Sequence, residues 1–260
     1  MQFEVLLTSK RIRFLLVSII LTLGLVFLSS PPYSTQIFWV YILALLAVFL
    51  SNFVLGGTVG IEKLTLLLLP AALTLGAGFS QFFFPNFTTL FRVGGWVSFF
   101  LAFYITLLAL NIFKVVRIKG EVIPLERVAR PTLFLLSFVA AFLLLTTIYK
   151  HALGVGVEIP LVFLMGFILS LPFLWALTLA DLLERDHLLG AFLVGIGLAQ
   201  ISAALSFYPW EAFLRGLVEA TFFYALLGIA RAYFERHLKY SIVLEYIALT
   251  LVVFFLARIF

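Results

Sequence analysis

The chain has 260 residues, of which 64% are hydrophobic and 11% are charged, whereas soluble domains carry about 25% charged residues. A mean hydropathy of +1.22 therefore excludes a soluble globule and indicates a membrane protein. The net charge of +5 does not indicate nucleic-acid binding, because the basic residues stand in short gaps between apolar runs; the absence of cysteine excludes disulfides and thiolate metal sites.

Nine apolar segments follow one another along the chain, each close to the roughly 20 residues that a helix needs to cross a bilayer. Pro, Gly and charged residues separate them. We predict an all-α transmembrane bundle of about nine spans, forming one membrane domain over residues 1–260. The expected helices are 12–29, 37–55, 64–84, 91–113, 132–149, 159–179, 188–207, 213–233 and 241–260.

The basic residues of the gaps predict the orientation of these helices, since Lys and Arg concentrate in cytoplasmic loops. If the amino terminus is cytoplasmic, all but four of the 17 basic residues fall inside, the exceptions being Arg92, Lys150, Arg215 and Arg258. An odd number of spans then places the carboxyl terminus outside. The very short loops favour a prokaryotic cytoplasmic membrane.

The longest gap, 114–131, holds five basic and two acidic residues. We expect it to be a cytoplasmic loop that lies against anionic lipid headgroups. The alternative is a docking segment for a cytoplasmic partner or for other membrane subunits.

An internal alignment of "LFRVGGWVSFFLA" with "FLRGLVEATFFYA" pairs Arg92 with Arg215. The match is compatible with two parallel four-helix repeats, 1–113 and 132–233, joined by the loop 114–131. The segment 241–260 is then an additional helix. The abundance of Phe and Leu leaves a chance match as the alternative.

The stretch "WEAFLRGLVEA" provides the strongest candidate site, because charged residues inside the hydrocarbon are costly. Glu211, Arg215 and Glu219 are spaced by four residues, so they share one helix face. Glu219 is expected about 9 Å below the outer boundary, at the depth of Gln200 on the preceding helix. With Arg92 placed by the repeat, these five residues form the predicted substrate-binding set, in an outward-facing polar pocket; the alternative is that they only join helices.

Recognisable catalytic motifs and metal-ligand spacings are absent from the sequence, so no cofactor or metal is expected and an enzyme is disfavoured. We expect a small transporter or a lipid-handling protein. Two alternatives stay open: a structural or assembly subunit of a larger membrane complex, and a membrane-embedded transferase acting on a lipid-linked substrate.

Overall fold

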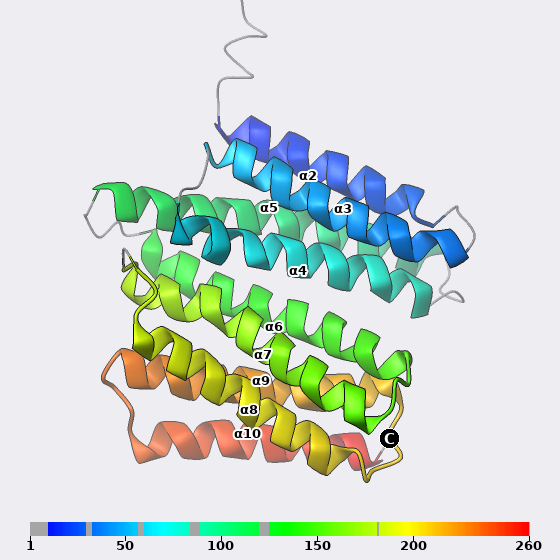
Figure 1. Ribbon diagram of the computed structural model, residues 1–260, viewed down its shortest axis with the longest axis vertical. Helices are drawn as coiled ribbons and strands as arrows, with labels where there is room; N and C mark the ends of the chain where they lie inside the picture. Colours follow the sequence, from blue (N-terminus) through cyan, green and yellow to red (C-terminus); the bar gives the residue numbers. More distant parts are fainter. Residues whose placement is uncertain are drawn as a thin grey trace, which may run out of the picture. The chain divides into compact units, whose positions relative to one another are not determined.

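A computed structural model of the chain describes residues 10–29, 33–56, 60–83, 89–119, 125–180 and 182–259. Within these residues every regular element is an α-helix, and nine helices follow the nine predicted apolar segments (Figure 1). The predicted all-α class is confirmed. The helices are α2 (Lys10–Phe27), α3 (Tyr33–Val54), α4 (Ile61–Phe83), α5 (Thr89–Lys119), α6 (Glu126–Lys150), α7 (Val155–Thr178), α8 (Arg185–Leu205), α9 (Ala212–Phe234) and α10 (Tyr240–Ile259).

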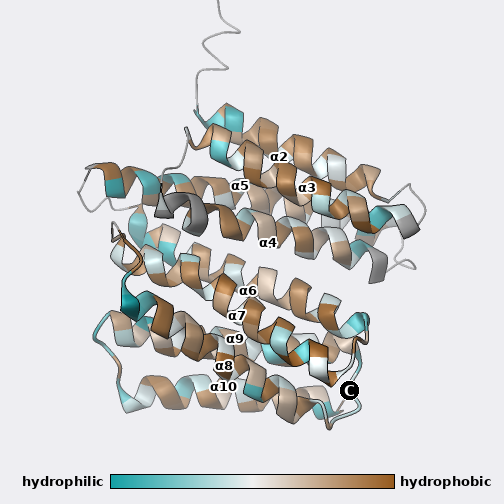
Figure 2. Cartoon of the chain, viewed as in Figure 1, coloured by the Kyte–Doolittle hydropathy of each residue, from teal (hydrophilic) through white to brown (hydrophobic). Residues whose placement is uncertain are grey.

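Seven of the described helices, α3 and α5 to α10, are long and apolar enough to span a membrane. Hydrophobic residues predominate along them (Figure 2). The 18-residue helix α2 starts with three cations, Lys10, Arg11 and Arg13, and the apolar part of α4 is shorter, Thr65–Gln81. A helix satisfies its own backbone hydrogen bonds, which is why apolar segments of this length adopt it in lipid. The chain is therefore a multi-pass membrane protein.

The helices group into two compact units, residues 1–136 and 137–260, so the boundary falls inside α6. In the first unit α2 packs on α3 and α5, and α4 packs on α3 and α5. In the second unit α7 packs on α8 and α9, α8 packs on α9, and α10 packs on α9. The proposed repeat of 1–113 and 132–233 stays a prediction.

In the first unit, a lysine side chain from α5 contacts the carboxyl-terminal end of α3. The ammonium group of Lys114, which is only 8% exposed, donates hydrogen bonds to the carbonyl oxygens of Leu55 (2.8 Å) and Gly56 (3.3 Å). The last carbonyls of a helix lack intrahelical partners and carry partial negative charge. Lys114 therefore caps α3 from a neighbouring helix.

The loop predicted for 114–131 is too long, because its first residue, Lys114, belongs to helix α5. Helix α5 continues to Lys119 and α6 begins at Glu126, and the Arg130 guanidinium pairs with Glu126 within the first turns of α6 at 2.5 Å. Residues 120–124 lie outside the described residues. The prediction ended each helix where the apolar run ended, whereas a helix extends past that point when charged residues can reach water or a partner.

In the second unit, two glycines let α7 and α8 meet backbone to backbone. A Cβ atom on Gly195 of α8 would lie 2.8 Å from the carbonyl oxygen of Phe163, and one on Gly166 of α7 would lie 3.2 Å from the Cα atom of Gly195. Small residues permit this close approach between membrane helices. The helices that carry the candidate site are thus packed tightly.

Candidate functional site

Helix α9 brings two of the predicted site residues together. Arg215 and Glu219 lie four residues apart, and the Arg215 Nε atom is 3.5 Å from the Glu219 Oε1 atom. The side chain of Glu219 is 0% exposed and that of Arg215 is 12% exposed. Positions four apart face the same way on a helix, so the predicted pairing of these two side chains is present.

Helix α7 adds a second carboxylate that the sequence analysis missed. The Arg215 Nη1 atom lies 3.2 Å from Glu158 Oε2, and the Glu158 side chain is only 7% exposed. The sequence predicts a helix that begins at residue 159, which leaves Glu158 in the preceding loop. It begins at Val155 instead, with Glu158 in its first turn, where a carboxylate is stabilised by the helix dipole.

Helix α6 places Tyr149 between the charged groups. Its hydroxyl donates to Glu219 Oε2 and lies 2.8 Å from the hydroxyl of Ser202. The Arg215 Cζ atom stands 3.8 Å from the centroid of the Tyr149 ring, within the range of a cation–π interaction. Tyr149 is only 7% exposed, so these contacts are largely shielded from the surroundings of the helices.

The close approach of α6 to α9 depends on Gly216, which follows Arg215. A Cβ atom on Gly216 would lie 2.9 Å from the backbone nitrogen of Thr146 and 3.0 Å from its Cα atom. Real Cβ atoms do not approach backbone so closely. A small residue at this position is what allows Tyr149 to reach Glu219.

Helix α8 completes the coordination of the guanidinium group. The Arg215 Nη2 atom lies 3.2 Å from the Ser202 carbonyl oxygen and 3.4 Å from its hydroxyl. Ser202 is fully buried. Each guanidinium nitrogen of Arg215 thus has a partner from a different place: Glu219 on its own helix, Glu158 on α7 and Ser202 on α8. We call the five residues Arg215, Glu158, Glu219, Tyr149 and Ser202 the Arg215 cluster.

The formal charges of the Arg215 cluster do not balance. It contains one guanidinium and two carboxylates, and the exposed fractions of the three charged side chains are 12%, 7% and 0%. Electrostatic interactions are strong where water is largely excluded. Both carboxylates therefore compete for one cation in a poorly hydrated place.

The other predicted site residues lie elsewhere. Gln200 is on the exposed side of α8, two residues before Ser202. Glu211 is exposed at the amino-terminal cap of α9, where its carbonyl oxygen accepts from the Arg215 backbone nitrogen at 2.9 Å. Arg92 is exposed on α5, in the first unit. Like Arg215 on α9, Arg92 is the fourth residue of its helix.

Among the described residues no group of three or more His, Asp or Glu side chains is placed to hold a metal ion. In the Arg215 cluster both oxygens of Glu219 and the Oε2 atom of Glu158 accept hydrogen bonds from Tyr149 and Arg215.

Comparison with known proteins identifies the family. Residues 20–260 match the family model described as "Protein of unknown function (DUF5656)". The chain belongs to this family. Neither the curated proteins nor the solved structures include a match. Membership of the DUF5656 family assigns no activity, so the functional argument depends on the Arg215 cluster itself.

Proposed function

We propose that the chain is a small membrane transporter or lipid-handling protein, and that its ligand site includes the Arg215 cluster. The supporting observation is the second carboxylate. Arg215 has a partner in Glu219 on its own helix, yet Glu158 is brought from α7 to the same guanidinium at 3.2 Å. Ionisable residues inside membrane helices are costly and commonly belong to substrate or ion pathways.

With both carboxylates ionised the Arg215 cluster carries one excess negative charge, and that charge defines the chemistry of the expected ligand. A buried charge without a partner is costly, by about 3–5 kcal/mol when one partner of a buried ion pair is lost. A purely structural link between α7 and α9 needs only one carboxylate per guanidinium. A group of positive charge, either a small metal cation or an ammonium, would neutralise the second one, and we expect the ligand to carry such a group.

The test is thermal unfolding of the detergent-solubilised protein in sodium, potassium or ethylammonium chloride, each compared with N-methylglucamine chloride at equal ionic strength. A ligand that binds only the folded state stabilises it, by about 2.7 kcal/mol at one hundred times its dissociation constant. We expect one of the small cations to raise the midpoint. The rise should disappear in Glu158→Gln and persist in Glu211→Gln, which changes an exposed carboxylate at the start of α9.

Sodium or potassium acting alone would indicate a metal cation, and ethylammonium acting alone would indicate an amine. If none of the three salts shifts the midpoint, or if Glu158→Gln responds as the wild type does, the proposed ligand site is wrong.

A structural or assembly subunit is the second candidate, and one observation favours it. The guanidinium nitrogens of Arg215 all have partners within the second unit, as expected for residues that only join helices. In addition, α10 leaves large apolar side chains exposed, among them Val252, Phe255 and Leu256. If the chain is such a subunit, each variant of the Arg215 cluster should change the unfolding midpoint by the same amount in all four salts.

The location and orientation of the chain follow from the same proposal. We propose the cell membrane, with a cytoplasmic amino terminus and an external carboxyl terminus, from the distribution of Lys and Arg. In that orientation the Arg215 cluster is near the outer boundary, since Arg215 and Glu158 lie in the first turns of α9 and α7. The variants Lys150→Cys and Arg236→Cys would test this orientation. A thiol reagent that does not cross the membrane should label the first from outside and the second from the cytoplasmic side.

A further inference from the structure

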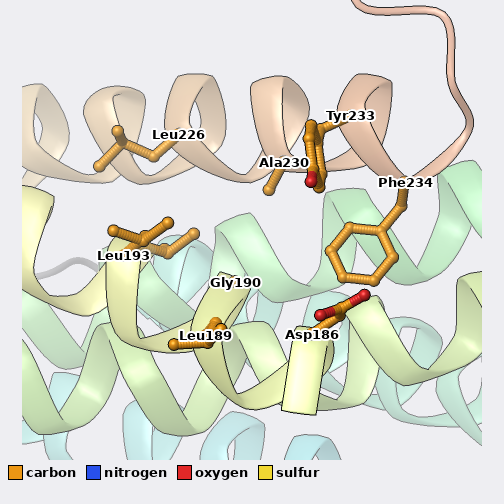
Figure 3. A pocket seen from close by; sticks show the side chains of 9 residues that line it. Asp186, Leu189, Gly190, Leu193, Leu226, Ala230, Tyr233 and Phe234 are labelled. Atoms are coloured by element: carbon orange, nitrogen blue, oxygen red, sulfur yellow. The ribbon is translucent and has the colours of Figure 1, made fainter. Parts of the chain in front are cut away.

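A groove lies between α8 and α9, away from the Arg215 cluster and sharing no residue with it. Its volume is about 310 Å³. Figure 3 shows side chains of the two helices facing each other across it. The lining residues are Asp186, Leu189, Gly190, Leu193, Val194, Leu226, Ala230, Tyr233 and Phe234.

The groove changes from polar to apolar along its length. Asp186 is in the first turn of α8, and Phe234 is the last residue of α9, so this end is at the level where both helices terminate. Leu193 lies seven residues further into α8, which corresponds to about 10 Å. A phospholipid has the same sequence of polarity, from charged headgroup to hydrocarbon chain.

The groove is open to the surroundings of the helices. Leu189, Leu193 and Tyr233 on its rim are 46%, 64% and 65% exposed, and both helices are apolar enough to span the membrane. Two residues of its lining, Gly190 and Ala230, have little or no side chain, which leaves room between the larger ones. An acyl chain can therefore enter sideways from the bilayer.

The wall at the polar end is held in place by His187. Its imidazole ring stacks on the Phe234 ring with centroids 5.5 Å apart. The same ring lies 2.7 Å from the Thr178 hydroxyl and accepts from the Glu184 backbone nitrogen at 3.1 Å. Because His187 is fully buried and bonded on both nitrogens, Phe234 has a fixed support.

The charge at the polar end selects the headgroup. Asp186 is the charged residue in the lining, and Arg231 on the adjacent part of α9 is paired with Glu235 at 3.1 Å. An ammonium group complements the Asp186 carboxylate, whereas a purely anionic headgroup does not. The volume is near the lower end of ligand pockets, about 300 Å³, which suits one chain and not a whole lipid.

We propose that the groove between α8 and α9 binds an aminophospholipid, with one acyl chain between Leu193 and Leu226 and the ammonium group at Asp186. The site shares no residue with the Arg215 cluster, so the two proposals can fail separately.

The experiment is native mass spectrometry of the delipidated protein with equimolar palmitoyl-oleoyl phosphatidylethanolamine, phosphatidylcholine and phosphatidylglycerol. A hydrogen bond between charged groups is worth about tenfold in affinity, so we expect the ethanolamine lipid to exceed the choline lipid by about that factor. The bulky trimethylated ammonium of choline cannot donate a hydrogen bond to Asp186.

Two variants separate the headgroup from the chain. Asp186→Asn should abolish the preference for the ethanolamine lipid and retain lipid binding. Ala230→Leu should fill part of the groove and reduce binding of all three lipids. The matched controls are Glu245→Gln and Ala248→Leu, which alter exposed positions on α10 and should behave as the wild type does.

Circular dichroism and gel filtration establish that each variant is folded before lipid binding is compared. Equal binding of the ethanolamine and choline lipids by the wild type would overturn the headgroup assignment. Undiminished binding by folded Ala230→Leu would overturn the site altogether. If Ala230→Leu does not fold, Ala230→Val with the same readout decides the matter.

Discussion

Replacing Arg215 with Met gives the most direct test of the Arg215 cluster. The substitution keeps an unbranched side chain of similar length but removes the charge and the donors. It leaves Glu158 and Glu219, whose side chains are 7% and 0% exposed, without the cation that both contact. Removing one partner from a buried ion pair costs about 3–5 kcal/mol, because the remaining charge is uncompensated.

The chain contains a matched control on the same helix. Arg231 and Glu235 are also four residues apart, but their side chains are 35% and 27% exposed. An exposed pair of this kind contributes about 0–1 kcal/mol. Both variants should lower the free energy of unfolding. The loss caused by Arg215→Met should exceed the loss caused by Arg231→Met by about 2 kcal/mol or more.

The assay is unfolding in mixed micelles by increasing mole fraction of sodium dodecyl sulfate, followed by circular dichroism. Adding Glu158→Gln and Glu219→Gln to Arg215→Met should restore most of the lost stability, because no buried charge is left. If Arg215→Met costs no more than Arg231→Met, or if the triple variant is less stable than the single one, the electrostatic account of the cluster is refuted.

Two further predictions concern packing and capping. Gly216→Val should destabilise the second unit by about 1–3 kcal/mol, because its side chain meets the backbone of Thr146; the control Gly156→Ala, with open space around its Cβ atom, should be neutral or stabilising in the same denaturation assay. Lys114→Met should cost about 1–3 kcal/mol by leaving the Leu55 carbonyl unbonded. Faster amide hydrogen exchange confined to the last turn of α3 would be its signature, and unchanged exchange there would contradict the capping role.

The apolar runs predicted the helices well because lipid offers no hydrogen bonds to an unfolded backbone. Their ends were harder to predict. Glu158 was placed outside its helix, since a carboxylate beside Pro160 marks an apolar boundary as readily as the first turn of a helix. Glu158 pairs with Arg215, which is 57 residues away on another helix. The spacing of residues along a single helix cannot predict such a contact.

The rotation of α8 could not be predicted from the sequence. Counting residues along the helices selected Gln200 as the neighbour of Glu219, and its depth in the membrane stays a prediction. Ser202 is the residue that makes the contact, and two positions apart on a helix correspond to about 200° of rotation. Hydrophobicity on all sides of α8 left its orientation undetermined, so only packing against α9 could select the polar residue that points inward.

The separation of 57 positions between Glu158 and Arg215 also has a consequence for how the protein is made. Ribosomes add about 5–20 residues per second, so Glu158 leaves the ribosome roughly three to eleven seconds before the cation that neutralises it. During that interval Glu158 has to stay at the aqueous boundary or in the insertion machinery. Helix α7 therefore reaches its final position in the bilayer late, after α9 has been synthesised and inserted.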